Sequence, residues 1–200
     1  MQTTNLFVEL IVIGFGAVIW LSLILLSVFG YAWIPFNQVL SLPALVPIVA
    51  ASYILGIVVD RLTDSASSYW DGKLRDQHFT DQQVYQNART IIYSQSTSLK
   101  DWFQYGRSRL RICRGWIFNA LLCLCSLLAF IWIRLPENSP RIRLTIAGFL
   151  FFSSLAISFA FAWYKLTNNE YLRLSKEYES FVQSGYRISV KDLVDYNLSK

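Results

Sequence analysis

Residues 6–29 read LFVELIVIGFGAVIWLSLILLSVF, and Glu9 is the only charged side chain among them. A helix needs roughly 20 apolar residues to cross a hydrocarbon core about 30 Å thick. This stretch therefore predicts a membrane-spanning helix. It is too long for the core of a signal peptide, no basic residue precedes it and no small-residue cleavage site follows it, so we interpret it as an uncleaved first span.

Three later stretches have the same character: Val39 to Val59, Trp116 to Ile133 and Leu144 to Trp163, none of which contains an Asp, Glu, Lys or Arg. Hydrophobic residues make up 54% of the 200-residue chain and charged residues only 16%, whereas an ordinary soluble protein is about 25% charged. One His and three Cys are too few for a Cys/His metal centre or a disulfide framework. The sequence therefore predicts an all-α, polytopic membrane protein with four transmembrane helices and no cofactor.

The distribution of Lys and Arg predicts the orientation. Fifteen of the eighteen basic residues lie in residues 60–115 or after Tyr164, three lie between the third and fourth spans, and none precedes the first span. Lys and Arg are enriched in the cytoplasmic loops of membrane proteins. We therefore expect a protein of the plasma (inner) membrane with both its N- and C-termini in the cytoplasm.

The spans and this orientation divide the chain into four parts. Residues 1–59 form a first transmembrane pair, 60–115 a cytoplasmic segment with a basic amphipathic helix, 116–164 a second transmembrane pair, and 165–200 a cytoplasmic helical tail. Turn-forming residues predict a loop within 60–81. Apolar residues at helical spacing predict helices over 81–94, from Ser98 into the third span, and from the fourth span to Gly185, with a short helix after Ser189. Together the two cytoplasmic parts predict a small helical layer.

The helix that leads into the third span has a basic face, formed by Arg107, Arg109, Arg111 and Arg114. A cation beside a span contributes about 1 kcal/mol near anionic lipid. These arginines fit two interpretations: they keep this segment in the cytoplasm, or they recognise anionic lipid headgroups in the bilayer. No nucleic-acid-binding motif accompanies them, so nucleic acid is not an expected partner.

Polar residues at bilayer depth are candidates for function because burying them there is costly. The candidates are Glu9, Asn119, Ser154 and Ser158. We expect Glu9, near the inner interface, to reach water or to pair with Arg61 or Lys165. The asparagine and the two serines, like Ser52 and Gly56, are expected to let helices approach closely and bond to one another. A polar conduction path along the same face is the alternative.

Asp60 and Asp64 lie one helical turn apart and are weak candidate Mg²⁺ ligands, close to basic residues that suit a lipid phosphate. Pairing of these helix-end acids with Arg61 is the competing explanation. His78, the single histidine, is expected in a solvated loop. No catalytic residue is therefore assigned.

The favoured hypothesis is a non-catalytic four-span protein that couples a membrane event to a cytoplasmic protein partner, as a sensor or scaffold. Its amphipathic extensions need cover for their apolar faces, which favours self-association as a homo-oligomer. A pore-forming or membrane-perturbing component, for example of a bacterial defence module, is the first alternative. An Mg-dependent lipid-phosphate enzyme that uses Asp60 and Asp64 is the second.

Overall fold

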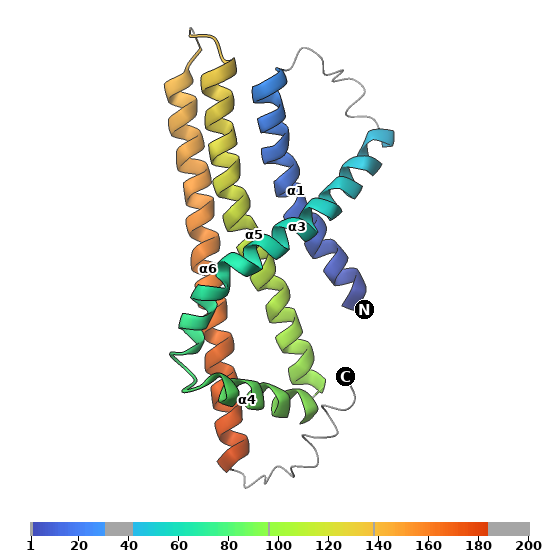
Figure 1. Cartoon of the computed structure of the whole chain (residues 1–200), viewed down its shortest axis with the longest axis vertical. Helices are drawn as coiled ribbons and strands as arrows, with labels where there is room; N and C mark the ends of the chain where they lie inside the picture. The colour runs from blue at the N-terminus through green and yellow to red at the C-terminus, as the bar shows by residue number, and fades with distance from the viewer. Residues whose placement is uncertain (1, 31–41, 96, 138, 184–200) are drawn as a thin grey trace.

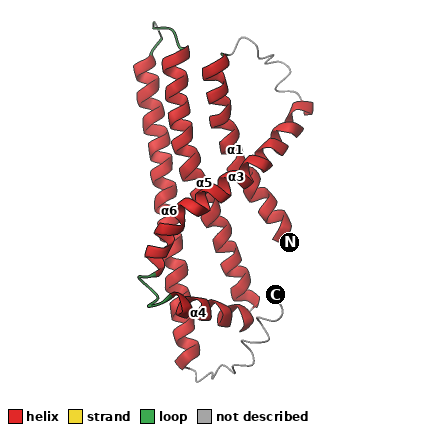
Figure 2. Cartoon of the chain, in the orientation of Figure 1, coloured by secondary structure: helices red, strands yellow, loops and turns green. Residues whose placement is uncertain are grey.

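The computed structural model describes residues 2–30, 42–95, 97–137 and 139–183, which form helices and turns without a strand. The helices are α1 (Gln2–Phe29), α3 (Leu42–Arg75), α4 (Gln82–Gln95), α5 (Thr97–Arg134) and α6 (Arg141–Gln183) (Figure 1). Figure 2 shows how little of the described chain lies in loops. The all-α prediction is confirmed, and α1, α3, α5 and α6 are each long and apolar enough to cross a membrane.

These four helices are longer than a bilayer requires. At 1.5 Å per residue, the 38 residues of α5 and the 43 residues of α6 extend over about 57 and 65 Å. The hydrocarbon core is only about 30 Å thick. Both helices therefore continue beyond their apolar segments, as predicted for the segment before the third span and for the tail. The predicted short helix after Ser189 lies outside the described residues.

The predicted loop within residues 60–81 is present but short, because α3 continues as helix to Arg75 and only residues 76–81 form a turn. The hydroxyl residues that suggested a loop bond to their own helix instead. Thr63 Oγ1 donates to Val59 O at 2.9 Å and Ser68 Oγ donates to Ser65 O at 2.8 Å. Such local bonds let hydroxyl side chains remain within a helix.

The helices form a bundle with a second layer at one end. α5 and α6 lie side by side, α1 packs against the apolar half of α5, and α3 runs obliquely across α1 and α5 to reach α6 (Figure 1). α4 crosses the lower ends of α5 and α6. The extensions of α3, α5 and α6 together with α4 make up what we call the extramembrane layer.

The crossing of α1 and α3 depends on glycine. A Cβ added at Gly14 would lie 1.6 Å from Ser52 O, and one added at Gly56 would lie 1.9 Å from Leu10 O. No other residue type allows this distance between two helix backbones. The close approach expected from Ser52 and Gly56 is therefore present, and small residues allow it, as in many membrane helix pairs.

The C-terminal end of α1 is capped by an arginine from α5. Gly30 has φ +78° and its N–H donates to Leu26 O at 3.0 Å, which is the usual glycine end of a helix. Arg134, the last residue of α5, donates from Nε to Ser27 O at 2.8 Å and also donates to Val28 O. A cation thus satisfies carbonyl groups that the helix leaves without a partner, and it fixes α1 to α5 far from the extramembrane layer.

Candidate functional site

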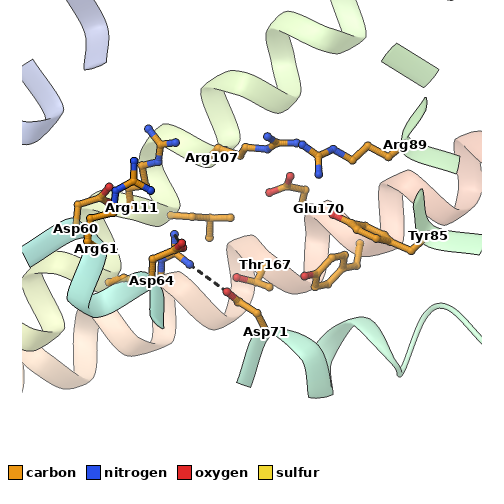
Figure 3. Close-up of a pocket in the computed structure, with 13 residues that line it drawn as sticks. Asp60, Arg61, Asp64, Asp71, Tyr85, Arg89, Arg107, Arg111, Thr167 and Glu170 are labelled. Carbon is orange, nitrogen blue, oxygen red and sulfur yellow. Dashed lines mark hydrogen bonds and ion pairs between the residues drawn. The ribbon is translucent and has the colours of Figure 1, made fainter. Parts of the chain in front are cut away.

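The extramembrane layer encloses a cavity of about 400 Å³ where α3, α4, α5 and α6 meet (Figure 3). Charged side chains dominate its lining. They are five arginines (Arg61, Arg89, Arg107, Arg111 and Arg114) and four acids (Asp60, Asp64, Asp71 and Glu170). The cavity borders the apolar segments of α3 and α5, because Asp60 directly follows Val59 and Arg114 lies two residues before Trp116.

Arg114 joins α5 to two turns of α3. Its Nη2 lies 3.0 Å from Asp64 Oδ1, and its Nη1 lies 3.1 Å from Asp71 Oδ2 and donates to Ser67 Oγ at 2.9 Å. The arginine side chain is 14% exposed and that of Asp71 is 27% exposed, whereas that of Asp64 is 58% exposed, so the pair with Asp71 is the more buried of the two. These two ion pairs hold α3 and α5 in one relative position, because separating the helices would leave charges unpaired.

Glu170 lies on the opposite side of the cavity. Its Oε2 is 3.6 Å from the position that a Cβ would take at Gly106, so the carboxylate sits against α5. In Figure 3, Arg107 from α5 and Arg89 from α4 extend toward one another above it. Burial raises the pKa of Glu170, and the charges of Arg107 and Arg89 oppose that rise. The carboxylate therefore lies in a partly dry site beside two cations.

The pKa of Asp71 is also raised, chiefly by burial, although Arg114 opposes the rise and Asp64 adds to it. Asp71 and Glu170 both lie beyond the apolar segments of their helices. The two carboxylates are thus both partly withdrawn from water beside arginines. In such an environment a charge interacts more strongly with its neighbours than it would in water.

An apolar cluster holds α4 under the cavity. Its buried members are Phe79, Ala88, Ile92, Phe103 and Leu174. Above them, the rings of Tyr85 and Tyr171 meet edge to face with centroids 5.8 Å apart, and both tyrosines line the cavity. His78 lies in a loop as expected, but it is half-buried and its Nε2 is 2.8 Å from Asn168 Oδ1. This pair ties the turn after α3 to α6.

The arrangement suits oxyanions better than metal ions. Among the described residues, no group of three or more His, Cys, Asp or Glu side chains is placed to hold a metal. Asp60 and Asp64 both reach the cavity, but Asp64 pairs with Arg114 and not with Arg61 as expected. Guanidinium groups, by contrast, present paired N–H donors that match carboxylate and phosphate oxygens.

The predicted headgroup-binding arginines separate into two groups. Arg107, Arg111 and Arg114 line the cavity. Arg109 does not: it is exposed and its guanidinium lies 4.2 Å from the ring centroid of Tyr105. The basic face recognised in the sequence is therefore mostly the wall of a cavity and only partly an open surface.

Glu9 is paired with neither of its expected partners. Its Oε2 lies 4.0 Å from Nη1 of Arg111, and the carboxylate is 9% exposed. The reason is that α1 and α5 run in parallel, with Ile13 against Gly115, so the residues one turn earlier on each helix face each other. Within the described chain Glu9 Oε2 has no hydrogen-bond partner, so this ion pair is long and lacks direct contact.

Asn119 is the polar joint between α1 and α5. It is fully buried; its Nδ2 donates to Ile13 O at 2.7 Å, and its Oδ1 accepts from Trp20 Nε1 at 3.2 Å. The absence of a side chain at Gly16 makes room for the amide, because a Cβ there would lie 2.5 Å from Nδ2. A buried amide that is bonded on both sides acts as a connection between helices.

Ser154 and Ser158 do not form the expected bonds between helices. Both are exposed, and Ser158 Oγ donates to Ser154 O of its own helix at 2.8 Å. The face of α6 that packs inward instead carries Gly148, where an added Cβ would meet Leu127 at 2.6 Å, and the buried Ala156. The two serines lie on the side of α6 that the described chain leaves uncovered.

Glu170 and the two cavity tyrosines were not anticipated from the sequence. A usable signal was present for Glu170, because it falls at helical spacing with Thr167, Tyr171 and Leu174, on the buried side of the tail helix. A single acid within an otherwise apolar stripe indicates a buried carboxylate with a nearby cation. Tyr171 shares this stripe, but its contact with Tyr85 depends on how α4 crosses α6, which no local pattern indicates.

Comparisons of this chain with models of known protein families, with curated proteins and with solved structures find no match.

Proposed function

We propose that this chain is a non-catalytic, multi-pass protein of the plasma (inner) membrane, with both termini in the cytoplasm, that couples a change in the bilayer to its cytoplasmic layer. The distribution of Lys and Arg supports the orientation, since the arginine-lined cavity and the basic tail fall on one side of the apolar segments. The extramembrane layer would then face the cytoplasm. We further propose that a cytoplasmic protein binds this layer and responds to its conformation.

The continuity of the helices is the observation that carries this proposal. α3, α5 and α6 each pass without interruption from an apolar segment into the wall of the cavity. A packed helix moves as a rigid element, so a change of its tilt in the bilayer displaces the residues at its far end. Arg114, which bonds to both Asp64 and Asp71, connects two of these helices where that displacement would be felt.

The bundle itself leaves much apolar surface uncovered. Ile146, Phe149, Leu150 and Ile157 of α6 are all more than half exposed, as expected for side chains that contact lipid. Contact with lipid alone accounts for this surface, so self-association stays a prediction.

A distance measurement across the layer tests the coupling. Spin labels at Lys73→Cys on α3 and Lys176→Cys on α6, both exposed sites outside the cavity lining, would be placed in a chain lacking its native cysteines. The protein is then reconstituted in phosphatidylcholine bilayers of shorter or longer acyl chains, which change helix tilt. We expect the distance between the labels to shift with bilayer thickness.

Arg114→Gln should reduce that shift, because it separates α3 from α5, whereas Arg109→Gln at an exposed site should leave it unchanged. A label distance that is the same in thin and thick bilayers would refute the coupling. Ion flux through liposomes containing the protein would favour the pore, and Mg²⁺-dependent turnover that Asp60→Asn abolishes would favour the enzyme.

A further inference from the structure

We propose that the cavity of the extramembrane layer binds a phosphate-bearing anion at the guanidinium groups of Arg89, Arg107 and Arg111, which line it from α4 and α5. This inference rests on the proposed coupling function, since it names the ligand of the layer that the bundle would move.

The balance of charge around the cavity favours an anion. Arg114 pairs with two of the four lining acids, Asp64 and Asp71. The whole lining holds five arginines against four acids, an excess of one cation, and the arginines other than Arg114 share the cavity with Asp60 and Glu170. Arg111 has only the 4.0 Å contact with Glu9 as an ion pair among those described. A site with more cations than anions attracts an oxyanion.

The geometry favours a phosphoryl group in particular. The cavity volume of about 400 Å³ falls within the usual range for small-ligand sites, which is roughly 300 to 1,000 Å³. Arg107 and Arg89 extend into it from two different helices, with Glu170 below them (Figure 3). Guanidinium groups bind phosphate oxygens through two N–H donors at once, so arginines on different sides can hold several oxygens of one phosphoryl group.

Because the cavity extends from the end of the apolar segments toward the water, the phosphoryl group can come from two sources. Its upper wall, with Asp60 and Arg61, directly follows the apolar segment of α3, at the level of lipid headgroups. Arg107 lies nine residues before Trp116, about 13 Å further from the hydrocarbon at 1.5 Å per residue. A phospholipid headgroup can enter from the bilayer side, and a soluble phosphate ester or pyrophosphate from the water side.

Binding is tested on the full chain in phosphatidylcholine nanodiscs. Inorganic pyrophosphate serves as the soluble probe, with sodium chloride at the same ionic strength as the control. Phosphatidic acid added to the nanodisc lipid serves as the lipid probe. The readouts are the thermal unfolding temperature as a function of probe concentration, and native mass spectrometry for the retained probe. We expect one of the two probes to raise the unfolding temperature and to stay bound.

Substitutions in the cavity identify the site. Arg107→Gln and Arg89→Gln should each weaken apparent binding about tenfold or more, as expected for the loss of charge-assisted hydrogen bonds. Arg107→Lys, which keeps the charge but loses the paired donors, should fall between these variants and the wild type. It also replaces Arg107→Gln if that variant does not fold. Arg109→Gln, outside the cavity, should bind as the wild type does.

Stabilisation by pyrophosphate assigns a soluble ligand, and stabilisation by phosphatidic acid alone assigns a lipid headgroup. The proposal is overturned if neither probe binds, or if Arg109→Gln weakens binding as much as Arg107→Gln, because attraction would then be a property of the whole basic surface. Probe binding without a thickness-dependent distance between labels at positions 73 and 176 would refute the coupling alone. A thickness-dependent distance without probe binding would refute only the ligand.

Discussion

The bundle and the extramembrane layer of this protein differ in how many large apolar side chains their outer surfaces carry. In the bundle, large apolar side chains such as Phe151 and Ile157 face outward, while the buried positions include Ser52 and Asn119. In the layer, Phe103 and Ile92 face inward. The apolar outer surface of the bundle is the arrangement expected of helices that contact lipid, whereas water favours apolar side chains in an interior.

The two regions also use different forces to hold their helices. Apolar burial drives association in water, but lipid tails are as apolar as leucine, so a bundle in lipid depends on close packing and hydrogen bonds between helices. In this bundle, Gly14 and Gly56 allow the close packing, and Asn119 forms the hydrogen bonds between helices. The layer combines an apolar cluster with the ion pairs of Arg114.

The largest expected effect comes from the glycine crossing. Gly14→Ala or Gly56→Ala places a Cβ within 2 Å of a backbone oxygen, which forces α1 and α3 apart. We expect the free energy of unfolding in detergent to fall by about 3 kcal/mol. The matched control is Gly72→Ala, whose Cβ would meet no atom closer than 4.0 Å and which should stabilise α3 by up to about 1 kcal/mol. Equal stability of the two kinds of variant would show that the backbones are not in contact.

The next effect concerns the ion pairs of the layer. Arg114→Gln leaves Asp64 and Asp71 without their cation. We expect a loss of about 1 to 3 kcal/mol, smaller than for a fully buried pair because Asp64 is 58% exposed. In a double-mutant cycle, Arg114→Gln should cost much less when Asp71→Asn is already present. Additive losses would mean that the two side chains do not interact.

Replacing Asn119, which bonds α1 to α5, should lower the free energy of unfolding by a smaller amount. Asn119→Leu removes the bonds to Ile13 O and Trp20 Nε1, and bonds between membrane helices contribute about 1 kcal/mol. Unfolding in detergent measures the loss. Ser158→Ala, at an exposed position that bonds only within α6 among the described contacts, serves as the control and should change stability by less than about 0.5 kcal/mol. Equal effects would place Asn119 outside the helix contact.

The smallest effect is a dependence of stability on pH. Because burial raises the pKa of Glu170 in the folded protein, folding favours its protonated form. The contribution of Glu170 to stability is therefore present at acid pH, and it is lost as the pH rises from about 4.5 through the raised pKa.

Glu170→Gln should remove this loss. The difference in unfolding free energy between wild type and Glu170→Gln, measured across the acid range, isolates Glu170 from Asp71, Arg89, Arg107 and Arg114, which face the same cavity. If the wild type instead gains stability relative to Glu170→Gln as the pH rises, the attraction of Arg107 and Arg89 for the carboxylate would exceed the cost of burying it.

The sequence was sufficient for features that depend on composition along the chain. The four apolar segments, the helix after Asp81 and the continuous helices into the layer all leave local patterns. The position of the loop within 60–81 could not be predicted, because a serine or threonine that bonds within its own helix cannot be distinguished in the sequence from one that ends a helix.

The candidate site could be predicted only in part. The basic face pointed to Arg107, Arg111 and Arg114, but their partners lie far away in the sequence: Asp71 is 43 residues from Arg114, and Ile13 is 106 residues from Asn119. Which helices meet, and at what level, decides those pairs. The parallel register of α1 and α5 gave Glu9 the partner Arg111, where proximity to the interface alone had suggested Arg61 or Lys165.

The most direct test of the account is the sidedness of the two ends of the bundle in intact cells. In a chain without native cysteines, Glu137→Cys, in the turn between α5 and α6, and Lys176→Cys, in the extramembrane layer, are both exposed sites. A membrane-impermeant thiol reagent added from outside should label Glu137→Cys at once and Lys176→Cys only after the membrane is permeabilised. Labelling of Lys176→Cys in intact cells, with Glu137→Cys protected, would contradict the orientation on which the cytoplasmic cavity and its proposed ligand depend.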